Sequence, residues 1–274
     1  MKKLIFSTVL YKTPPKDLKK ILESIELLSI ALKKKNIDIE IEKFLICDNF
    51  VDHNNHYPNI NFKEFSFDII YSKSERNLGY GMGHNSNLLN QNIDCNTWFI
   101  ALNPDIYFTG ENMTPFFEYI TSYPGISCAA PLIYLQNGEI QYSAKKSPTF
   151  FSLIISRFSF FQKISFLRKY LDLNQNKNID YKKNIIPSEF LSGCFLVFPS
   201  KVYAEIKGFS KKYFLHFEDA DIVRRCNLIG LSIHCPFGFA THIRGRGSHK
   251  SSFQQLHLTL SYVRYSKYWG FKLF

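Results

Sequence analysis

Short apolar runs alternate with segments of helical character in the first part of the chain, and this alternation constrains the fold more than any other feature. The runs at 4–10, 42–47, 67–71 and 97–102 have the length of β-strands. Between the first two, apolar residues over 18–32 recur at helical spacing. Strands that alternate with helices predict an α/β fold with a mostly parallel central sheet and flanking helices.

Polar residues follow three of these runs. Asp48 comes directly after the second run, the glycine-rich segment 76–85 follows the third, and Asp105 follows the fourth. Ligands of parallel sheets bind at the carboxyl ends of the strands. The three positions therefore predict a binding site along one rim of the sheet.

The turn after the fourth run reads Asn103-Pro104-Asp105. Proline cannot continue the strand and fixes the turn. A carboxylate at this place is suited to Mg²⁺ or Mn²⁺ that bridges a diphosphate. Asn-Pro-Asp is also an ordinary turn sequence, so both interpretations remain open at this point.

The segment 76–85 contains Gly79, Gly81 and Gly83 and leads into a predicted helix. It is not a dinucleotide-binding fingerprint, because Gly-x-Gly-x-x-Gly would need glycine where His84 stands. Glycines still permit close approach of the backbone to a ligand, and a helix N-terminus favours phosphate. The alternative is a tight connection between loop and helix.

Three acids, Glu218, Asp219 and Asp221, open a predicted helix over 219–229. The helix dipole favours acids in a first turn, and Asp221 with Arg225 forms an i,i+4 pair of structural character. Three acids in four residues exceed what capping needs. A carboxylate that faces a cleft can act as general base on a sugar hydroxyl.

The rest of the second half contains strand signals at 190–198 and 231–235. His242 follows the second of these, and the segment 240–250 adds Arg244, Arg246 and His249, among others. Basic residues with glycines suit a loop that faces a diphosphate. A solvated basic loop is the alternative.

The segments 150–171 and 262–274 are basic and rich in aromatic residues. Such amphipathic sequences are typical of helices that lie in a membrane interface, although helices packed on a core have the same pattern. No uncharged apolar stretch reaches the ~20 residues of a membrane span. The six cysteines form no Cys-x-x-Cys pair and indicate a reducing compartment. We expect a cytoplasmic protein, peripheral on the inner face of the membrane.

The formal charge of +11 suits an anionic partner. A nucleic-acid-binding protein is one candidate class, but the chain has no recognised nucleic-acid module, and carboxylates at the rim repel phosphates. A catalytically inactive scaffold is another candidate, against which the retained acids argue. We therefore expect no nucleic acid among the partners.

In their order and spacing, the motifs resemble those of inverting family 2 glycosyltransferases of the GT-A fold. Within that family they are most similar to bacterial rhamnosyltransferases that extend lipid-linked glycans for O-antigen and related polysaccharides. The resemblance covers most of the chain. The motifs that carry it are Asp48-Asn49, Gly79–Asn85, Leu102–Ile106, Ser192–Val197 and Tyr213–Asp221.

The resemblance implies a role for each matching position. It makes Asp219 the general base with Glu218 beside it, and it makes Asp105 the metal ligand, helped by His242. Asn103 stands where the family's Asp-x-Asp motif has its first aspartate, which leaves fewer protein ligands for the metal. The implied donor-binding residues are Thr8, Tyr11, Asp48, Arg76, Asn77, Gly79, Gly81, Asn85, Asn103 and Asp105. The implied diphosphate or acceptor residues are Gly193, Arg244, Arg246 and His249.

The resemblance also implies substrates and an organisation. The donor is a nucleotide sugar, dTDP-rhamnose in first place, with a UDP-hexose or UDP-N-acetylhexosamine as the alternative. The acceptor is a polyprenyl-diphosphate-linked or other glycan. We expect a Rossmann-like donor half over 1–110, an acceptor-binding and catalytic half over 111–250, and an amphipathic segment with acceptor-side helices over 251–274.

Overall fold

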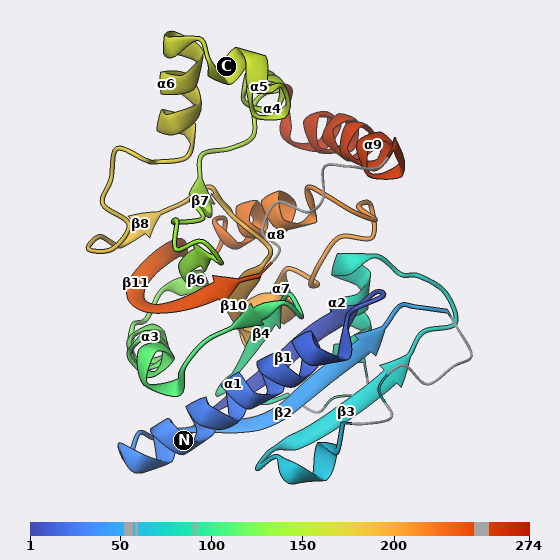
Figure 1. The fold of residues 1–274 in the computed structure, drawn as a ribbon, viewed down its shortest axis with the longest axis vertical. Helices are drawn as coiled ribbons and strands as arrows, with labels where there is room; N and C mark the ends of the chain where they lie inside the picture. Colours follow the sequence, from blue (N-terminus) through green and yellow to red (C-terminus); the bar gives the residue numbers. More distant parts are fainter. Residues whose placement is uncertain (52–56, 58–59, 90, 92, 244–251) are drawn as a thin grey trace.

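The structure is a computed structural model that describes residues 1–274 except 52–56, 58–59, 90, 92 and 244–251. Its centre is a nine-stranded mixed sheet (Figure 1). In sheet order, the strands are β3 (Asp68–Lys73), β2 (Ile39–Asp48), β1 (Lys2–Leu10), β4 (Thr97–Leu102), β10 (Phe195–Pro199), β6 (Ile126–Leu135), β11 (Leu231–His242) and β5 (Ile106–Tyr107), with β8 (Ile186–Pro187) paired to β11.

The first four strands in this order are mutually parallel, as the sequence predicts. β10 runs antiparallel to both β4 and β6, while β6 and β11 are parallel to each other. The four strands predicted in the first part of the chain are confirmed as β1 to β4. The strand predicted at 231–235 continues to His242, which carries this histidine to the same end of the sheet as Asp105.

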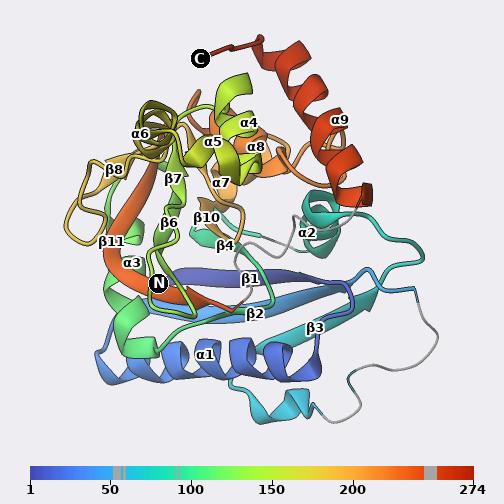
Figure 2. The ribbon, with the colours of Figure 1, turned by 45° about the horizontal axis from the view of Figure 1, so that its top comes forward.

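Two hydrophobic cores cover the two faces of the sheet, because successive side chains of a strand point to opposite sides. Leu4 and Phe6 pack toward α1 (Pro15–Lys34) and α3 (Gly110–Ser122). Ile5, between them, packs into the core that includes α7 (Ser200–Glu205) and α8 (Glu218–Cys226). Figure 2 shows α1 below the sheet and α2 (Tyr80–Leu88) and α8 above it.

A helical layer lies beyond α8, at the top of Figure 1. It consists of α4 (Phe150–Arg157), α5 (Ser159–Gln162), α6 (Ser165–Asn174) and α9 (Ser252–Trp269). The small sheet of β7 (Ala144–Lys145) and β9 (Phe190–Leu191) leads into this layer, and a short 3₁₀ helix, η1 (Phe62–Glu64), precedes β3.

The amphipathic segment 150–171 is not one continuous helix, because the chain forms three short helices there. The backbone is extended at Phe158 and again at Ile164, which interrupts the helix twice. Gln162 donates from Nε2 to the carbonyl oxygens of Ile155 and Ser156, at 3.2 and 3.1 Å. These bonds satisfy carbonyls at the end of α4 that a continued helix would have satisfied.

The strand predicted over 190–198 is divided as well. Residues 190–191 pair with β7 in the small sheet, and residues 195–199 enter the main sheet as β10. The turn between them, at Gly193, makes hydrogen bonds to other parts of the rim. None of the helices described here is long and apolar enough to span a bilayer.

Candidate active site

The carboxyl ends of β1, β2 and β4 meet at one rim. Thr8 donates from its hydroxyl to the carbonyl oxygen of Leu102 at 3.0 Å, which ties the end of β1 to the end of β4. Asp48 is the last residue of β2 and lies in register with Leu10 of β1. Tyr11, just beyond β1, is exposed and stacks edge-on against Phe50 with 5.8 Å between the ring centres.

Asp48 is buried and held by two donors. One carboxylate oxygen accepts the backbone N–H of Phe50 at 3.0 Å, and the other accepts the hydroxyl of Tyr71 at 2.5 Å. Burial, together with the bond to Asp48, raises the pKa of Tyr71, so this hydroxyl remains a donor. The next residue, Asn49, donates to the carbonyl oxygen of Gly79 at 3.0 Å, which attaches the glycine-rich segment to β2.

At the start of α2, the backbone of the glycine-rich segment lies very close to the segment that precedes the acidic helix α8. Asn77 accepts the N–H of Gly79 at 2.9 Å, and Gly79 adopts a left-handed conformation with φ 78°. A Cβ on Gly79 would lie 2.2 Å from the carbonyl oxygen of Phe214, and one on Gly81 would lie 2.8 Å from the Cβ of Phe209. The glycines therefore let α2 pack directly against the segment that precedes the acidic helix.

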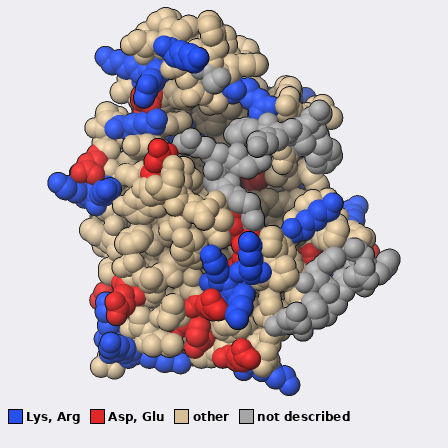
Figure 3. Space-filling view, in the orientation of Figure 1, with Lys and Arg blue, Asp and Glu red and all other residues tan. Residues whose placement is uncertain are grey.

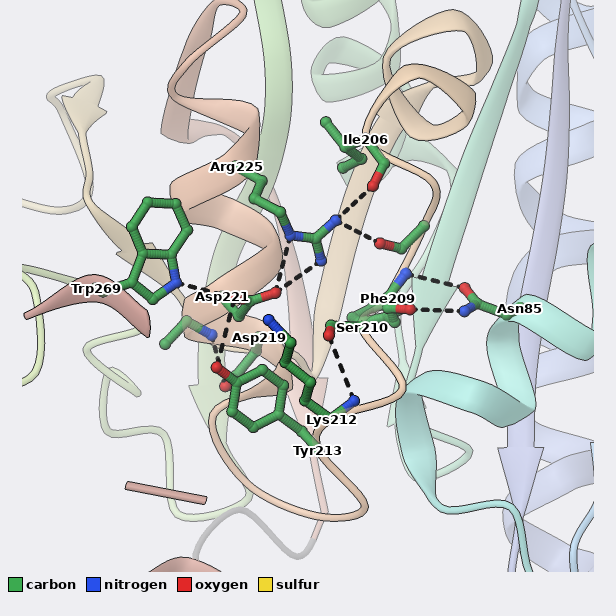
Figure 4. A network of polar contacts seen from close by, with 12 residues as sticks. Asn85, Ile206, Phe209, Ser210, Lys212, Tyr213, Asp219, Asp221, Arg225 and Trp269 are labelled. Carbon is green, nitrogen blue, oxygen red and sulfur yellow. Dashed lines mark hydrogen bonds and ion pairs between the residues drawn. The ribbon is translucent and has the colours of Figure 1, made fainter. Parts of the chain in front are cut away.

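Asn85 does not join this rim. Its side chain accepts the hydroxyl of Tyr203 at 2.7 Å. It also accepts the N–H of Phe209 at 2.9 Å and donates to the carbonyl oxygen of Phe209 at 2.8 Å (Figure 4). It lies beside a cavity of about 970 Å³ between α2 and α7. Arg76, expected with it in a nucleoside pocket, is exposed beyond the end of β3.

Asp105, Asn103 and His242 form a compact group beside the end of β4. The imidazole Nε2 of His242 lies 3.3 Å from the Asp105 carboxylate and 3.3 Å from the Asn103 amide nitrogen. Burial lowers the pKa of His242, but the hydrogen bond to Asp105, with further contributions from Cys194, outweighs this and raises it to about 10. In the absence of another cation, the pair is therefore an imidazolium beside a carboxylate.

This group has the donor types of a divalent-metal site. The other imidazole nitrogen of His242 lies 2.8 Å from the side-chain oxygen of Gln141, as the second nitrogen of a metal-bound histidine usually does with an oxygen partner. Within the described part of the chain, no three His, Cys, Asp or Glu side chains cluster as a complete metal site. Mg²⁺ commonly takes one or two carboxylates and completes its shell with water and substrate phosphates, so Asp105 fits such an ion. His242 would bind the ion only after losing its proton, because a metal-ligating imidazole is neutral.

The acids of α8 serve two different purposes. Asp221 binds Arg225 at 2.8 Å and accepts the indole N–H of Trp269 at 2.9 Å (Figure 4). Arg225 in turn donates to the carbonyl oxygens of Ile206 and Gly208, at 2.6 and 2.7 Å. The structural interpretation of the Asp221–Arg225 pair is thus confirmed, and the pair also fixes α9 and the 206–208 turn to α8.

Asp219 faces the turn between β9 and β10 instead. One of its oxygens accepts the N–H of Gly193 at 3.0 Å, and the other accepts the N–H of Ala220 at 2.9 Å. The carbonyl oxygen of Gly193 accepts the hydroxyl of Tyr80, at the start of α2. The Gly193 peptide therefore bridges the acidic helix and the glycine-rich helix.

The same turn connects Asp219 to the Asp105 group. The N–H of Asn103 donates to the carbonyl oxygen of Cys194 at 2.9 Å, one residue beyond Gly193. Asp219 and Asp105, far apart in the sequence, are thereby held on the same side of the sheet. The Gly193–Cys194 turn is thus the link between the two carboxylates.

Burial shifts the pKa values of the two carboxyls that begin α8, and the interaction between their charges adds to the shift of Glu218. Burial raises the pKa of Glu218 to about 8, and the negative charge of Asp219 adds to the shift. Burial also raises the pKa of Asp219, while the N–H bonds from Gly193 and Ala220 and the charge of Lys145 oppose the rise. The pKa values of both carboxyls are therefore raised, and the two groups titrate as one coupled pair.

We expect Glu218→Gln to gain stability over the wild type as the pH rises from about 4.5 to about 8. Below the ordinary value of 4.5, Glu218 is protonated in both the folded and unfolded states; above it, only the unfolded state ionises readily, which destabilises the native wild type. The gain is on the order of a few kcal/mol. Urea unfolding at pH 5 and pH 8 measures it, with the exposed Glu139→Gln as the control. An equal effect of E218Q at both pH values would contradict the burial argument.

The turn before α8 is strained, which the sequence does not indicate. His216 and Phe217 both have left-handed backbones, with φ 69° and 66°. Such conformations cost on the order of 1–3 kcal/mol each in residues other than glycine and cluster at functional sites. The Phe217 ring packs against Tyr262 and Tyr265 of α9, with centres 5.7 and 5.3 Å apart, so α9 helps to maintain the turn.

Three of the predicted residues, Arg244, Arg246 and His249, lie outside the described residues. Sequence reasoning missed Tyr80 and Gln141, which orient the Gly193 peptide and His242. Gln141 lies three residues after Asn137-Gly138, a dipeptide that is typical of hairpin turns, and no other local pattern marks it.

No protein-family model matches the chain. Two curated relatives are rhamnosyltransferases. The N-acetylglucosaminyl-diphospho-decaprenol L-rhamnosyltransferase of Mycobacterium tuberculosis is 24% identical over 212 residues, 70% of this chain and 66% of the relative. The rhamnosyltransferase WbbL of Escherichia coli is 23% identical over 165 residues, 57% of each chain. The chain thus spans 66% and 57% of the length of these two relatives.

Solved structures share the fold at low sequence identity. GalNAc-T7 with UDP, GalNAc and Mn²⁺ superposes with a TM-score of 0.60 and 12% identity, over 88% of this chain and 44% of that one. The mannosyltransferase PcManGT of Pyrobaculum calidifontis, with GDP-Man and Mn²⁺, gives 0.59 and 11%, over 96% and 64%. The predicted GT-A-type fold and the predicted resemblance to family 2 rhamnosyltransferases are confirmed.

Proposed function

We propose that this chain is an inverting glycosyltransferase that moves L-rhamnose from dTDP-rhamnose to a lipid-linked glycan. The observation that carries the proposal is the Gly193 turn, which holds the Asp219 carboxylate on the same rim as the Asp105–His242 pair. Transfer of an activated sugar in a single displacement requires two groups at one rim. One is a base for the acceptor, and the other is a group that binds the diphosphate.

In the proposed reaction, Asp219 takes the proton of an acceptor hydroxyl. As the proton leaves, the hydroxyl oxygen bonds to the anomeric carbon of the donor, and the bond from that carbon to the diphosphate oxygen breaks. The bonding pair departs with the nucleoside diphosphate, so one displacement inverts the anomeric centre. Burial raises the pKa of Glu218 and of Asp219, which favours a base that takes up the acceptor's proton.

The leaving group is proposed to lie by Asp105 and His242, which would hold Mg²⁺ or Mn²⁺. Such an ion, when bound, would neutralise the charge that develops on the diphosphate. The ends of β1 and β2 would hold the nucleoside, with Asp48 at its base and Thr8, Tyr11, Asn77 and Gly79 nearby. The Mn²⁺ in both structural neighbours supports this assignment.

Rhamnose as the transferred sugar is supported by the names of both curated relatives, and a lipid diphosphate acceptor by the name of the first. A UDP-hexose or UDP-N-acetylhexosamine is the second candidate donor, because a few pocket contacts decide the sugar.

Thermal unfolding with each nucleotide sugar, with and without Mn²⁺, tests the choice of donor. A Mn²⁺-dependent rise in Tm with dTDP-rhamnose is expected, followed by transfer of labelled rhamnose. A rise with UDP sugars alone would contradict the donor.

The same proposal includes a membrane surface as partner. The aromatic segments far apart in the sequence adjoin each other: the N–H groups of Phe150 and Phe151 donate to the carbonyl oxygens of Lys272 and Leu273, at 2.9 and 3.1 Å. Large apolar side chains on α4–α6 and the C-terminal segment are exposed, namely Phe158, Phe160, Phe166, Phe271, Leu273 and Phe274. Figure 3 shows Lys and Arg gathered at this end of the molecule. Apolar side chains among cations suit an anionic bilayer.

We expect the protein to sediment with vesicles that contain anionic phosphatidylglycerol and to do so less with neutral phosphatidylcholine. Replacing Phe160 and Phe166 with serine should weaken binding about tenfold or more, since burying one Phe side chain contributes ~1.5–3 kcal/mol. Leu228→Ser, an exposed apolar position outside these helices, is the control. Failure of the wild type to sediment with anionic vesicles at low salt would remove the membrane from the proposal.

A further inference from the structure

A cavity of about 210 Å³ lies between the acidic helix and the helical layer above it. It has room for about seven waters at ~30 Å³ each, or for a single sugar ring. Glu218 and Asp219 line it on one side, and apolar side chains from the helices line the other, among them Leu153, Leu171 and Leu258. The cavity therefore joins the proposed base to the layer that carries the exposed aromatic residues.

Glu218 provides the first sign that this cavity holds a polar ligand. Its side chain is 6% exposed, and its Oε2 has no hydrogen-bond partner among the residues that the structure describes. A buried polar atom without a protein partner is costly and is usually satisfied by water or a bound group. Because Oε2 belongs to a residue that lines the cavity, a sugar hydroxyl is the kind of group that would complete it.

Two lysines provide the second sign. Lys145, in β7, and Lys146, just after it, both line the same cavity. Lys145 lies over the ring of Phe190, 5.1 Å from its centre, and its charge reaches Asp219. The acids and the apolar helices suit a neutral sugar, and two adjacent cations beside it suit an anionic group that is joined to that sugar.

We propose that this cavity is the acceptor subsite, in which Lys145 and Lys146 bind the phosphate that is joined to the acceptor sugar. The inference rests on the proposed function. The sugar ring lies against Glu218 and Asp219, the phosphate lies at the two lysines, and the apolar chain continues over α4 and α9 toward the exposed aromatic face. Lys145 and Lys146 are then specificity-determining residues that select phosphorylated over neutral acceptors.

The test compares two acceptors that differ only in the phosphate. One is N-acetylglucosamine diphosphate with an undecyl chain, and the other is undecyl N-acetylglucosaminide. Calorimetry measures binding of each to the wild type, K145Q, K146Q and the double variant, and rhamnose transfer gives KM and kcat. Lys201→Gln, an exposed lysine on α7, is the matched control. Inorganic pyrophosphate is added as a competitor. It shows whether the lysines bind any free phosphate group or only the phosphate that is joined to the acceptor sugar.

Each lysine variant should weaken binding of the diphosphate acceptor by about tenfold or more, as expected for loss of a charge-assisted hydrogen bond. Binding of the neutral glycoside should change less than twofold in every variant. Its kcat is compared in K146Q only, because K145Q also removes a charge that lowers the pKa of Asp219. Equal effects on both acceptors, or none on either, would overturn the proposal. If the lysine variants lose the diphosphate acceptor while the wild type transfers no sugar, the subsite stands and the proposed function fails. If pyrophosphate binds as tightly as the diphosphate acceptor, the lysines form a general anion site and the acceptor subsite is refuted.

Discussion

Asp219→Asn is expected to lower sugar transfer by about 10²–10⁴-fold while the donor still binds. General base catalysis contributes roughly this factor, and an amide cannot take the proton of the acceptor hydroxyl. The amide oxygen can still accept one of the N–H groups of Gly193 and Ala220, so the fold around it should persist. Single-turnover transfer measures the chemical step, and a thermal shift with dTDP-rhamnose measures donor binding.

Asp221→Asn is the matched control for this variant, because the same change is made two residues further along α8. Asp221 binds Arg225 and Trp269 and not the rim, so its variant should unfold at lower temperature yet retain transfer. Near-normal turnover by D219N would remove the base assignment. A loss of donor binding equal to the loss of rate would show that the residue holds the substrate and not the proton.

Asp105→Ala is expected to weaken Mn²⁺-dependent donor binding by about 100-fold or more. Loss of a residue that only orients a ligand already costs about 10–100-fold in metal affinity, and Asp105 would contact the ion directly. Gln141→Ala is the graded comparison, because Gln141 lies 2.8 Å from the far nitrogen of His242 and would act through it. We expect Gln141→Ala to weaken Mn²⁺-dependent donor binding less than Asp105→Ala does.

Calorimetry of nucleotide binding with and without Mn²⁺ measures both variants. In the wild type, the metal should strengthen binding, and in D105A the two titrations should coincide. If wild-type affinity is the same with and without the metal, the lysines and arginines of the chain neutralise the diphosphate alone. The assignment of Asp105 and His242 to a metal would then be wrong.

Local sequence patterns predicted the donor side of the fold. Apolar runs have a strand-like length, and each ends in a polar residue, so β1 to β4 and the rim at Asp48 and Asp105 follow from periodicity alone. The acids at 218 and 219 could be recognised because the start of this helix has more acidic residues than capping needs. His242 was singled out by its place after a strand in a basic segment. Its role beside Asp105 came only from the resemblance, because no spacing in the sequence connects the two residues, which are 137 positions apart.

Tertiary hydrogen bonds explain what could not be predicted. The run 190–198 is apolar enough for one strand, but the Gly193 peptide turns to meet Tyr80 and Asp219, which no local pattern records. The interruption of 150–171 depends on Gln162 reaching back to α4. Asn85 matches a family motif, yet its side chain is used to hold Phe209.

Strand β10 has a consequence for synthesis of the protein. It is the antiparallel strand between β4 and β6, and it is made only after both of them. Until residues 195–199 leave the ribosome, β4 and β6 each present an unpaired edge, and exposed edges recruit other chains. Nascent chains that stop before residue 195 should therefore aggregate or require chaperones. Chains that extend past 199 can join β4 to β6, and the other edge of β6 is covered once β11 is made.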